Sequence, residues 1–483
     1  MLLLDALFMA TLKQFFLGNT KVFSQPRFAA AHRWYIEIIP WVSHLSVRFE
    51  MNMEVRKKHR RLDYRFTFFS ALEALFWAMI APSGYMVVFM TDQGFTNSQI
   101  GIALACNNLA CLCFLPIWGI VADKLGSKRK TLIILYFGVG ISAVFTALFT
   151  GNVWLTIGLI FIVLIFRGSV ASITDSWVIT EVNTPDLSGN RINYGPIRSA
   201  GSIGYALAGF LYYFMFTTLH IDTRWSWLAS TFFAIPCILL ALSYREQGNV
   251  QAAPRRLKAL SMKDLKPGRL AKNYYFVTFF VIYMLFNIPG YFGLSYISQL
   301  LETMGEKPVF VGVLGSIRAL CEVPLLFCSK KIIQKLGYKK TLFIIGTALA
   351  IEQVSYVFCN EIWQVTLFQM LHGSINGLLL GAAVGYIFSL VPPELSATAQ
   401  TFCGASCSAV TIIGNLLSGW LIDSFGVRSI FVVSTSCTVL AIALFALSLL
   451  IGKLCKISHY DAANDPVSQE ILHKLYASSG ESN

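Results

Sequence analysis

Charge is scarce in this sequence. Asp, Glu, Lys and Arg make up only 13% of its 483 residues, while 55% are hydrophobic and 14% are aromatic, and the mean hydropathy is +0.62. A soluble domain typically has about 25% charged residues. The composition therefore excludes a soluble globular protein and predicts a helical protein that crosses a membrane several times.

Sequence patterns that bind metals or phosphate are also missing. The eleven cysteines lie mostly in apolar runs, and the pairs Cys111/Cys113 and Cys403/Cys407 have no His or acidic neighbours in the sequence. No Gly-rich phosphate loop and no sizeable soluble domain is present. We therefore expect no disulfide framework, no metal, no cofactor and no enzymatic activity.

Long apolar runs dominate the sequence instead. A run of about 20 residues crosses a hydrocarbon layer of about 30 Å as an α-helix. The predicted spans are residues 64–90, 98–121, 131–150, 154–180, 195–218, 225–243, 273–297, 309–329, 341–358, 362–391, 397–422 and 427–451. The sequence thus predicts an all-α membrane protein with twelve transmembrane helices.

The net charge of +13 raises the question of nucleic-acid binding, but the distribution of Lys and Arg indicates a membrane topology. Basic residues gather before the first span, after the second, between the sixth and seventh, and after the eighth. The connections TDQGFTNS and TGNV have none. The positive-inside rule then places both termini in the cytoplasm of a multi-pass cell-membrane protein. Its expected partners are the lipid bilayer and a small-molecule substrate, with no nucleic acid, and we expect a monomer.

The polar loop after the sixth span divides the chain into two halves. We expect a cytoplasmic N-terminal segment over 1–63, a six-helix bundle over 64–243, a basic cytoplasmic linker over 244–272, a second six-helix bundle over 273–452 and a cytoplasmic polar tail over 453–483. Met51 and Met53 lie just before the basic stretch VRKKHRR (55–61), and we hypothesise that translation starts at one of them.

An internal repeat supports the division into halves. GIVADKLGSKRKTL (119–132) follows the second span and KKIIQKLGYKKTL (330–342) follows the eighth, so that Gly126 aligns with Gly337. Duplicated six-helix halves are typical of secondary transporters, whose substrate site lies at mid-membrane between the halves.

The first copy of this repeat resembles the Gly-x-x-x-Asp-(Lys/Arg)-x-Gly-(basic) loop of the major facilitator superfamily. The resemblance implies that Gly119, Asp123, Gly126 and Arg129 form a conformational gate and do not contact substrate. A plain basic turn would explain the cations but not Gly119 and Asp123.

Over residues 64–452 the chain is similar to the lactose permease branch of that superfamily, the oligosaccharide:proton symporters. YGPIRSAGSIGYAL (194–207) resembles the fifth helix of this branch, and LHGSIN (371–376) and ELSATAQ (394–400) resemble its tenth helix and the start of its eleventh. Phenylpropionate and nucleoside permeases share parts of these patterns. The resemblance implies two pseudo-symmetric six-helix bundles and a transport function.

Charged groups inside the spans mark the candidate site, because each costs about 2.5–3.5 kcal/mol by insertion scales and normally faces a cavity or a partner. These groups and the neutral amide of Asn287 make up the following set of polar residues inside the spans: Glu73, Arg167, Asp175, Arg198, Asn287, Arg318, Glu322, Glu352 and His372. The resemblance implies that Arg198 and Asp175 hold a sugar and that Tyr205 stacks against it. Alternatively, Arg198 snorkels to the end of its span, Asp175 pairs with Arg167, and Tyr205 only packs.

In the second half, Arg318 and Glu322 are four residues apart, on one helix face, and can neutralise each other. By resemblance, Glu322 and His372 join sugar recognition to proton transfer; alternatively, both only stabilise the bundle. The family's proton-carrying glutamate is Ile375 here, and its ninth-helix arginine is Glu352. The proton must then ride on Glu322, Glu352 or Glu73, and we favour Glu322, with Glu352 or His372 as a relay.

These residues predict a symporter that imports a small sugar or oligosaccharide by alternating access, with the proton as coupling ion. The expected substrate contacts are Asp175, Arg198, Tyr205, Asn287, Glu322 and His372, while Arg167 and Arg318 are expected in buried ion pairs. Two alternatives stay open. In the first, the protein takes up an aromatic carboxylate or a nucleoside, because the three arginines could leave a cation unpaired in the cavity. In the second, it is a facilitator without proton coupling, because Ile375 replaces the family's proton-carrying glutamate.

Overall fold

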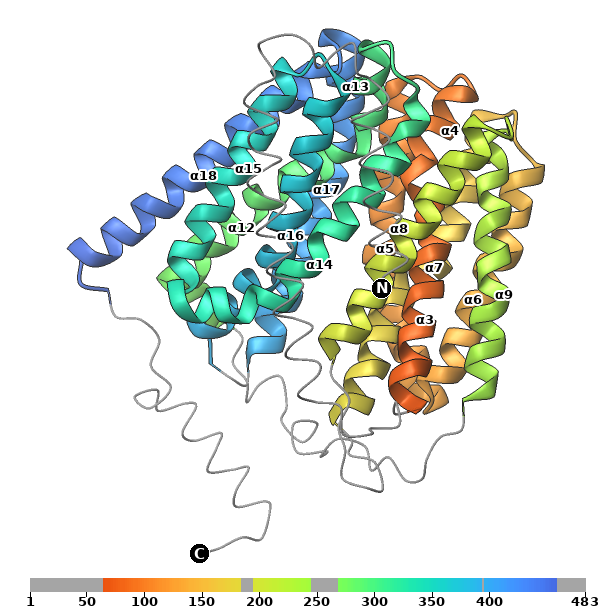
Figure 1. Ribbon diagram of the computed structural model, residues 1–483. Coiled ribbons are helices and arrows are strands. Elements are labelled where there is room, and N and C mark those ends of the chain that lie inside the picture. The colour runs from red at the N-terminus through yellow and green to blue at the C-terminus, as the bar shows by residue number, and fades with distance from the viewer. Residues whose placement is uncertain (1–63, 184–193, 245–267, 393–394, 458–483) are drawn as a thin grey trace, which may run out of the picture. The chain divides into compact units, whose positions relative to one another are not determined.

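The computed structural model describes residues 64–183, 194–244, 268–392 and 395–457, which belong to one compact unit beginning at Tyr64 (Figure 1). The predicted segment 1–63 with its alternative starts, most of the linker 244–272 and the tail beyond residue 457 lie outside these residues. The secondary structure of the described residues consists of helices and short 3-10 turns, without strands.

Twelve membrane-length helical segments follow one another in this unit. The first half contains α3 (Tyr64–Ile80) with α4 (Met86–Asp92), α5 (Asn97–Leu125), α6 (Lys128–Leu148), α7 (Val153–Asn183), α8 (Tyr194–Thr217) and α9 (Ser226–Ser243). The second half contains the short α11 (Arg269–Lys272), α12 (Tyr274–Phe292) with α13 (Ile297–Thr303), α14 (Val311–Leu336), α15 (Tyr338–Phe358), α16 (Ile362–Leu390), α17 (Ser396–Phe425) and α18 (Arg428–Leu454). Within the described residues, eleven segments are apolar enough to span a membrane by composition, and α8 completes the predicted twelve.

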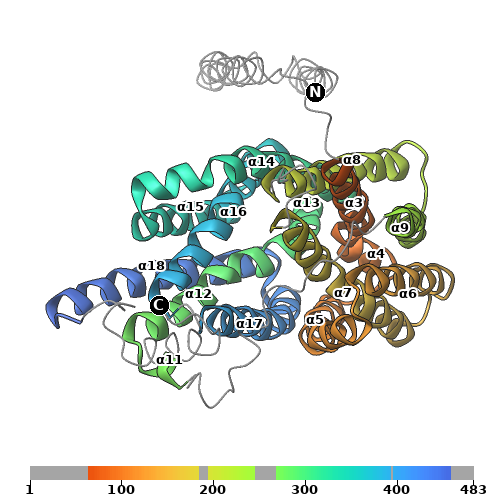
Figure 2. The ribbon, with the colours of Figure 1, turned by 90° about the horizontal axis from the view of Figure 1, so that it is seen from below.

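Each half has a hydrophobic core of its own, and a third core joins the halves. Phe69 and Tyr136 belong to the core of the first half, and Phe279 and Phe445 belong to that of the second. The shared core combines residues of both halves, such as Ile100 and Phe431. Figure 2 shows the two groups of helices side by side, viewed along the bundle.

The first helix of each half is interrupted at a matching place. The 3-10 turn Ala81–Tyr85, which begins with Ala-Pro, separates α3 from α4, and the 3-10 turn Leu294–Tyr296 follows Pro289-Gly290 between α12 and α13. Proline removes a backbone donor and clashes with the preceding turn, so each helix changes direction there. Interrupted helices in corresponding positions of two halves are a mark of the substrate region in transporters.

The two ends of the bundle differ in charge. We call the end with the α5–α6 and α14–α15 turns the basic end, because Lys128, Arg129, Lys339 and Lys340 lie there, and the other the opposite end. The repeated glycines of these turns have equivalent roles. Gly126 (φ 60°) ends α5 and Gly337 (φ 77°) ends α14 in backbone conformations that L side chains rarely adopt.

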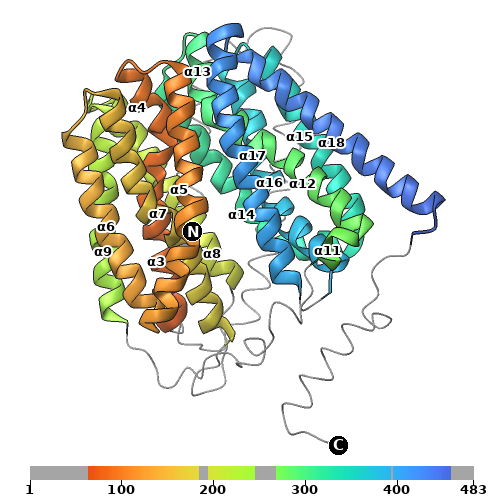
Figure 3. The same ribbon diagram turned by 180° about the vertical axis from the view of Figure 1, so that it is seen from behind.

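The two halves are packed closely together toward the opposite end. There α5 lies against α17 (Figure 3), and α8 lies against α14. A Cβ atom at Gly101 would collide with the carbonyl oxygen of Asn415, and one at Gly419 would collide with that of Asn97. Between α14 and α8, the Ser316 hydroxyl donates a hydrogen bond to the carbonyl oxygen of Ala206 at 2.8 Å. Backbone contact of this kind requires small residues.

A carboxylate of the second half caps the first turn of α5. Asp423 of α17 accepts hydrogen bonds from the Asn97 amide at 2.8 Å and the Ser98 backbone N–H at 3.0 Å, and from the Ser98 hydroxyl. An acid at a helix N-terminus satisfies free N–H groups and complements the helix dipole. The cap therefore favours the state in which the opposite end is closed.

We predict that Asp423→Ala shifts the protein away from this closed state, because Asn97 and Ser98 lose their acceptor on the other half. The distance between spin labels on the α6–α7 and α15–α16 turns should lengthen or broaden. Asp222→Ala is the matched control, because Asp222 is also exposed and pairs with Arg224 of its own half at 3.6 Å. Equal distances in all three proteins would contradict the prediction.

Candidate functional site

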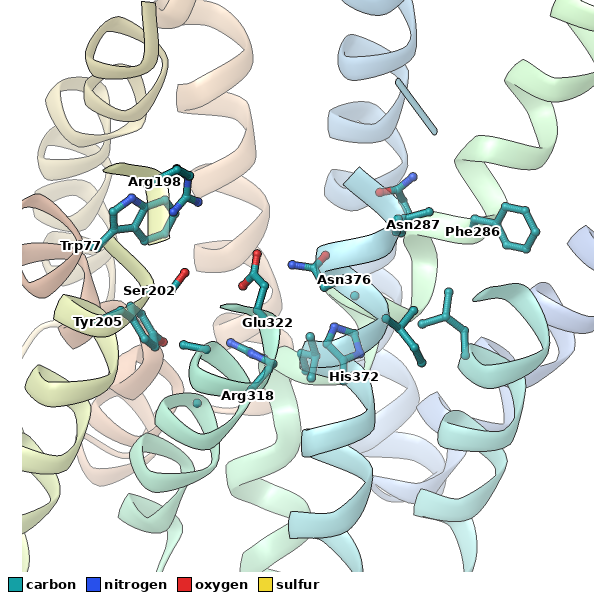
Figure 4. A pocket seen from close by; sticks show the side chains of 17 residues that line it. Trp77, Arg198, Ser202, Tyr205, Phe286, Asn287, Arg318, Glu322, His372 and Asn376 are labelled. Atoms are coloured by element: carbon teal, nitrogen blue, oxygen red, sulfur yellow. The ribbon is translucent and has the colours of Figure 1, made fainter. Parts of the chain in front are cut away.

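A polar cavity of about 290 Å³ lies between the two halves. Its volume is at the lower end of the roughly 300–1,000 Å³ found for ligand sites. The polar and aromatic residues that line it are Trp77, Arg198, Ser202 and Tyr205 from the first half and Phe286, Asn287, Arg318, Glu322, His372 and Asn376 from the second (Figure 4). The structure thus gathers Arg198, Tyr205, Asn287, Glu322 and His372, which the sequence predicted as substrate contacts.

One face of α8 forms the wall of the first half. Arg198, Ser202 and Tyr205 lie at spacings of four and three residues, which put them on the same side of a helix. The Arg198 guanidinium carbon lies 4.3 Å from the centre of the Trp77 ring of α3. The Tyr205 ring reaches the other half, where a Cβ atom at Gly315 would lie 3.3 Å from its hydroxyl.

The second half contributes a cation and a carboxylate from α14. Arg318 and Glu322 both line the cavity, and the positive charges of Arg198 and Arg318 act on the Glu322 carboxyl group. Asn376 also lines the cavity on the side of Glu322. Within the described residues no salt bridge joins Arg318 to Glu322, so the predicted ion pair is not formed in this structure.

His372 and Glu352 form a buried pair behind the cavity wall. The His372 Nδ1 atom lies 3.0 and 2.9 Å from the two carboxylate oxygens of Glu352, which is completely buried in α15. The Tyr356 hydroxyl donates to Glu352 Oε1 at 3.1 Å, and the Gln369 amide donates to the Tyr356 hydroxyl at 3.0 Å. His372 therefore contacts the cavity and an enclosed carboxylate at the same time.

Glycines at every fourth position of α16 determine how this helix packs against α14. Gly373 and Gly377 lie against the backbone of Arg318 and Glu322, and Gly381 and Gly385 continue the stripe toward the basic end. Side chains at these positions would force α16 away from α14. The stripe therefore places His372 and Asn376, one residue before each glycine, beside the charged pair of α14.

Asp175 and Arg167 do not line the cavity with Arg198, although the charges of Asp175 and Arg198 interact. Asp175 lies outside the cavity lining and accepts a hydrogen bond from the Tyr194 hydroxyl at 2.9 Å. Arg167 is 8% exposed, and its Nη1 atom is buried without a hydrogen-bond partner in the part of the chain that the structure describes. Neither the predicted Arg198–Asp175 clamp nor an ion pair of Arg167 is formed among these residues.

The predicted gate lies at the basic end, away from the cavity. Gly119 has open space beside it, and Asp123 is exposed near the end of α5. Arg129 donates to the carbonyl oxygen of Tyr244 at 2.8 Å. Lys128 donates to the Ser176 carbonyl oxygen, also at 2.8 Å, so the turn is tied to the ends of α7 and α9. Groups of His, Cys, Asp and Glu that could hold a metal are absent from the described residues.

Sequence reasoning missed Trp77, Ser202 and Asn376. Each follows a predicted polar residue, Glu73, Arg198 or His372, by four positions, which is one helical turn on the same face. This spacing is the feature of the sequence that could have identified them. None of the three is charged, so none stands out against the apolar background as the charged residues do, and only the cavity identifies them.

Twelve helices in two halves around a central polar cavity define a membrane transporter. The model of the MFS_1 like family matches residues 64–433, and the chain belongs to this family of major facilitator transporters, which are not enzymes. It is thus a multi-pass transporter of the bacterial permease type.

The relatives in sequence are transporters and sugar permeases. The chain is 24% identical to the Uncharacterized transporter YwbF of Bacillus subtilis, over 84% of this chain and 97% of the relative. It is 24% identical to the sucrose permease of Escherichia coli, over 82% and 96%, and 24% identical to the lactose permease of Klebsiella oxytoca, over 63% and 74%.

Solved structures share the fold. The nucleoside transporter NupG superposes with a TM-score of 0.65 at 15% identity, covering 80% of this chain and 99% of NupG. The D-xylose-proton symporter superposes with a TM-score of 0.58 at 16% identity, covering 79% and 95%. The predicted twelve-helix fold and the resemblance to the lactose permease branch are confirmed.

We predict that Glu352→Leu lowers the melting temperature of the purified protein, whereas Glu352→Gln lowers it much less. Leucine leaves His372 Nδ1 and the Tyr356 hydroxyl buried without an acceptor, at a cost of about 1–3 kcal/mol for each group. Glutamine keeps an acceptor oxygen. Thermal unfolding in detergent measures the difference, and a leucine variant as stable as the parent would show that these contacts do not hold α15 and α16 together.

Proposed function

We propose that this protein transports a small sugar or oligosaccharide through the central cavity by alternating access. The observation that carries the proposal is the meeting of Arg198, Arg318 and Glu322 from two halves around one cavity with aromatic walls. Guanidinium groups donate to hydroxyl oxygens, a carboxylate accepts from hydroxyl groups, and aromatic rings cover C–H faces. A neutral polyhydroxylated substrate matches this mixture of both signs.

Alternating access follows from where the halves touch. Contacts through Gly101, Gly419 and the Asp423 cap close the opposite end, so substrate in the cavity would exchange with the basic end. Opening the opposite end requires the two halves to rock about the cavity, as in other duplicated transporters. The distribution of basic residues supports a cytoplasmic location of the basic end and of both termini in the cell membrane.

Proton coupling is the second part of the proposal. His372 contacts both the cavity and the enclosed Glu352 carboxylate, so the pair can hold a proton that arrives from the cavity. Glu322 faces the same cavity and can exchange this proton while it contacts substrate. Protonation then favours substrate binding from outside, and release inside follows deprotonation.

One observation favours a second candidate substrate. Neither Arg198 nor Arg318 forms a salt bridge among the described residues, and the cavity has the rings of Trp77, Tyr205 and Phe286 on its walls. An aromatic carboxylate would pair with a free guanidinium and stack on these rings, and a nucleoside would use the rings alone. Both belong in the test.

A substrate panel tests the proposal. In proteoliposomes with an imposed proton gradient, labelled lactose, melibiose or sucrose should accumulate, and uptake of the active sugar should be accompanied by alkalinisation outside the vesicles. Phenylpropionate and uridine serve as the alternatives, and empty liposomes as the control. Uptake of one of these two compounds without uptake of any sugar at any pH would show that the substrate assignment is wrong.

Glu352→Gln should separate transport from coupling. We expect sugar counterflow, which needs no net proton movement, to stay within about twofold of the parent, while accumulation driven by the proton gradient falls at least tenfold. Glu361→Gln, an exposed position at the start of α16, is the matched control. Undiminished accumulation by the Glu352 variant would remove this residue from the proton route.

A further inference from the structure

A buried carboxylate next to the cavity has no part in the function proposed so far. Glu73 of α3 is 1% exposed, and its Oε2 atom accepts a hydrogen bond from the Trp77 indole N–H at 3.0 Å. A carboxylate inside a membrane span is costly, and such residues are normally kept for function. The hydrogen bond links Glu73 to the cavity, because Trp77 itself lines the cavity.

The Trp77 indole is fixed on several sides. Glu73 holds its nitrogen, the Phe76 ring lies 5.5 Å away centre to centre, and a Cβ atom at Gly201 of α8 would collide with its Cδ1 atom. Only glycine at position 201 allows α8 to approach the indole this closely. The ring is therefore held in one orientation at the boundary between α3 and α8.

This orientation determines how Arg198 meets the cavity. The guanidinium lies over the Trp77 ring at 4.3 Å, and within the described residues it forms no salt bridge (Figure 4). Stacking on an aromatic face is a favourable contact for guanidinium and leaves the N–H groups at its edge free to donate. An unstacked arginine would instead sample many rotamers.

We propose that Trp77 orients the Arg198 guanidinium for substrate binding and that Glu73 holds Trp77 in the orientation this requires. Both are positioning residues for the cation of the first half. The proposal rests on the proposed function only in its assumption that Arg198 binds a sugar. Glu73 thus positions Trp77, and Trp77 positions Arg198.

Transport kinetics test whether Glu73 and Trp77 position Arg198. With labelled lactose counterflow, Trp77→Leu and Glu73→Leu should each raise KM roughly three- to thirtyfold, the range expected for loss of a desolvated cation–π contact, and change kcat little. Glu73→Gln should stay close to the parent, because its amide oxygen still accepts the indole N–H. Trp77→Phe keeps a ring without the N–H and should fall between.

A second measurement does not depend on the substrate. In protein labelled with 5-fluorotryptophan, the ¹⁹F resonance missing from Trp77→Phe identifies Trp77. That resonance should be sharp in the parent and in Glu73→Gln and shifted or broadened in Glu73→Leu. Trp118→Phe is the matched control, since its indole also donates to a protein oxygen, the Ile165 carbonyl at 3.0 Å, but lies outside the cavity lining.

Three results would overturn the proposal. They are an unchanged KM in Trp77→Leu, an unchanged Trp77 resonance in Glu73→Leu, and loss of gradient-driven accumulation in Glu73→Gln with normal counterflow, which would show that Glu73 acts through its charge. Failure of the parent protein to take up any sugar would count against the proposed function instead. The fluorine spectra would still decide whether Glu73 positions Trp77.

Discussion

A charged side chain in the hydrocarbon layer of a membrane must have either a partner or access to a cavity, and this constraint organises the whole interior of the protein. Glu352 meets it with His372 and Tyr356, and Glu73 meets it with Trp77. Arg198, Arg318 and Glu322 meet it by facing one cavity between the halves. The charges that lack a salt-bridge partner there are therefore available to a substrate.

Arg167 is an exception, because the described residues give its charge neither a salt-bridge partner nor a place in the cavity lining. It is almost completely buried in α7, and one of its nitrogens has no hydrogen-bond partner there. Its charge interacts with Cys111 and with Tyr205, and Tyr205 lines the cavity. This buried positive charge therefore acts on one of the residues of the cavity wall.

Small residues decide how these groups meet. Glycines bring α16 against α14, so that His372 and Asn376 lie beside Arg318 and Glu322. Other glycines bring α5 against α17 and close the opposite end. Within the spans, a glycine is a position where two backbones can approach, and the charged residues depend on that approach for their geometry. Recognition and movement are therefore built on the same helix contacts.

The two halves share a plan but differ in chemistry. Both begin with a helix interrupted beside proline, and both have a positive-φ glycine after their second helix. Their polar groups have diverged. The first half offers an arginine stacked on tryptophan, whereas the second offers a carboxylate and a histidine paired with a buried acid. Pseudo-symmetric halves with unlike walls give one cavity two chemically different sides.

The sequence by itself determined the twelve helices, because in hydrocarbon every backbone group must bond within its own segment and apolar length shows where that happens. It also identified Arg198, Arg318, Glu322 and His372, because charges stand out against an apolar background. Only the tertiary structure decided the partners. Glu352 and His372 are on different helices, and so are Trp77 and Arg198, and the distances between them follow from where glycines let helices touch. The same packing left Asp175 with Tyr194 and outside the cavity, although the resemblance to the lactose permease branch implied a substrate contact for it.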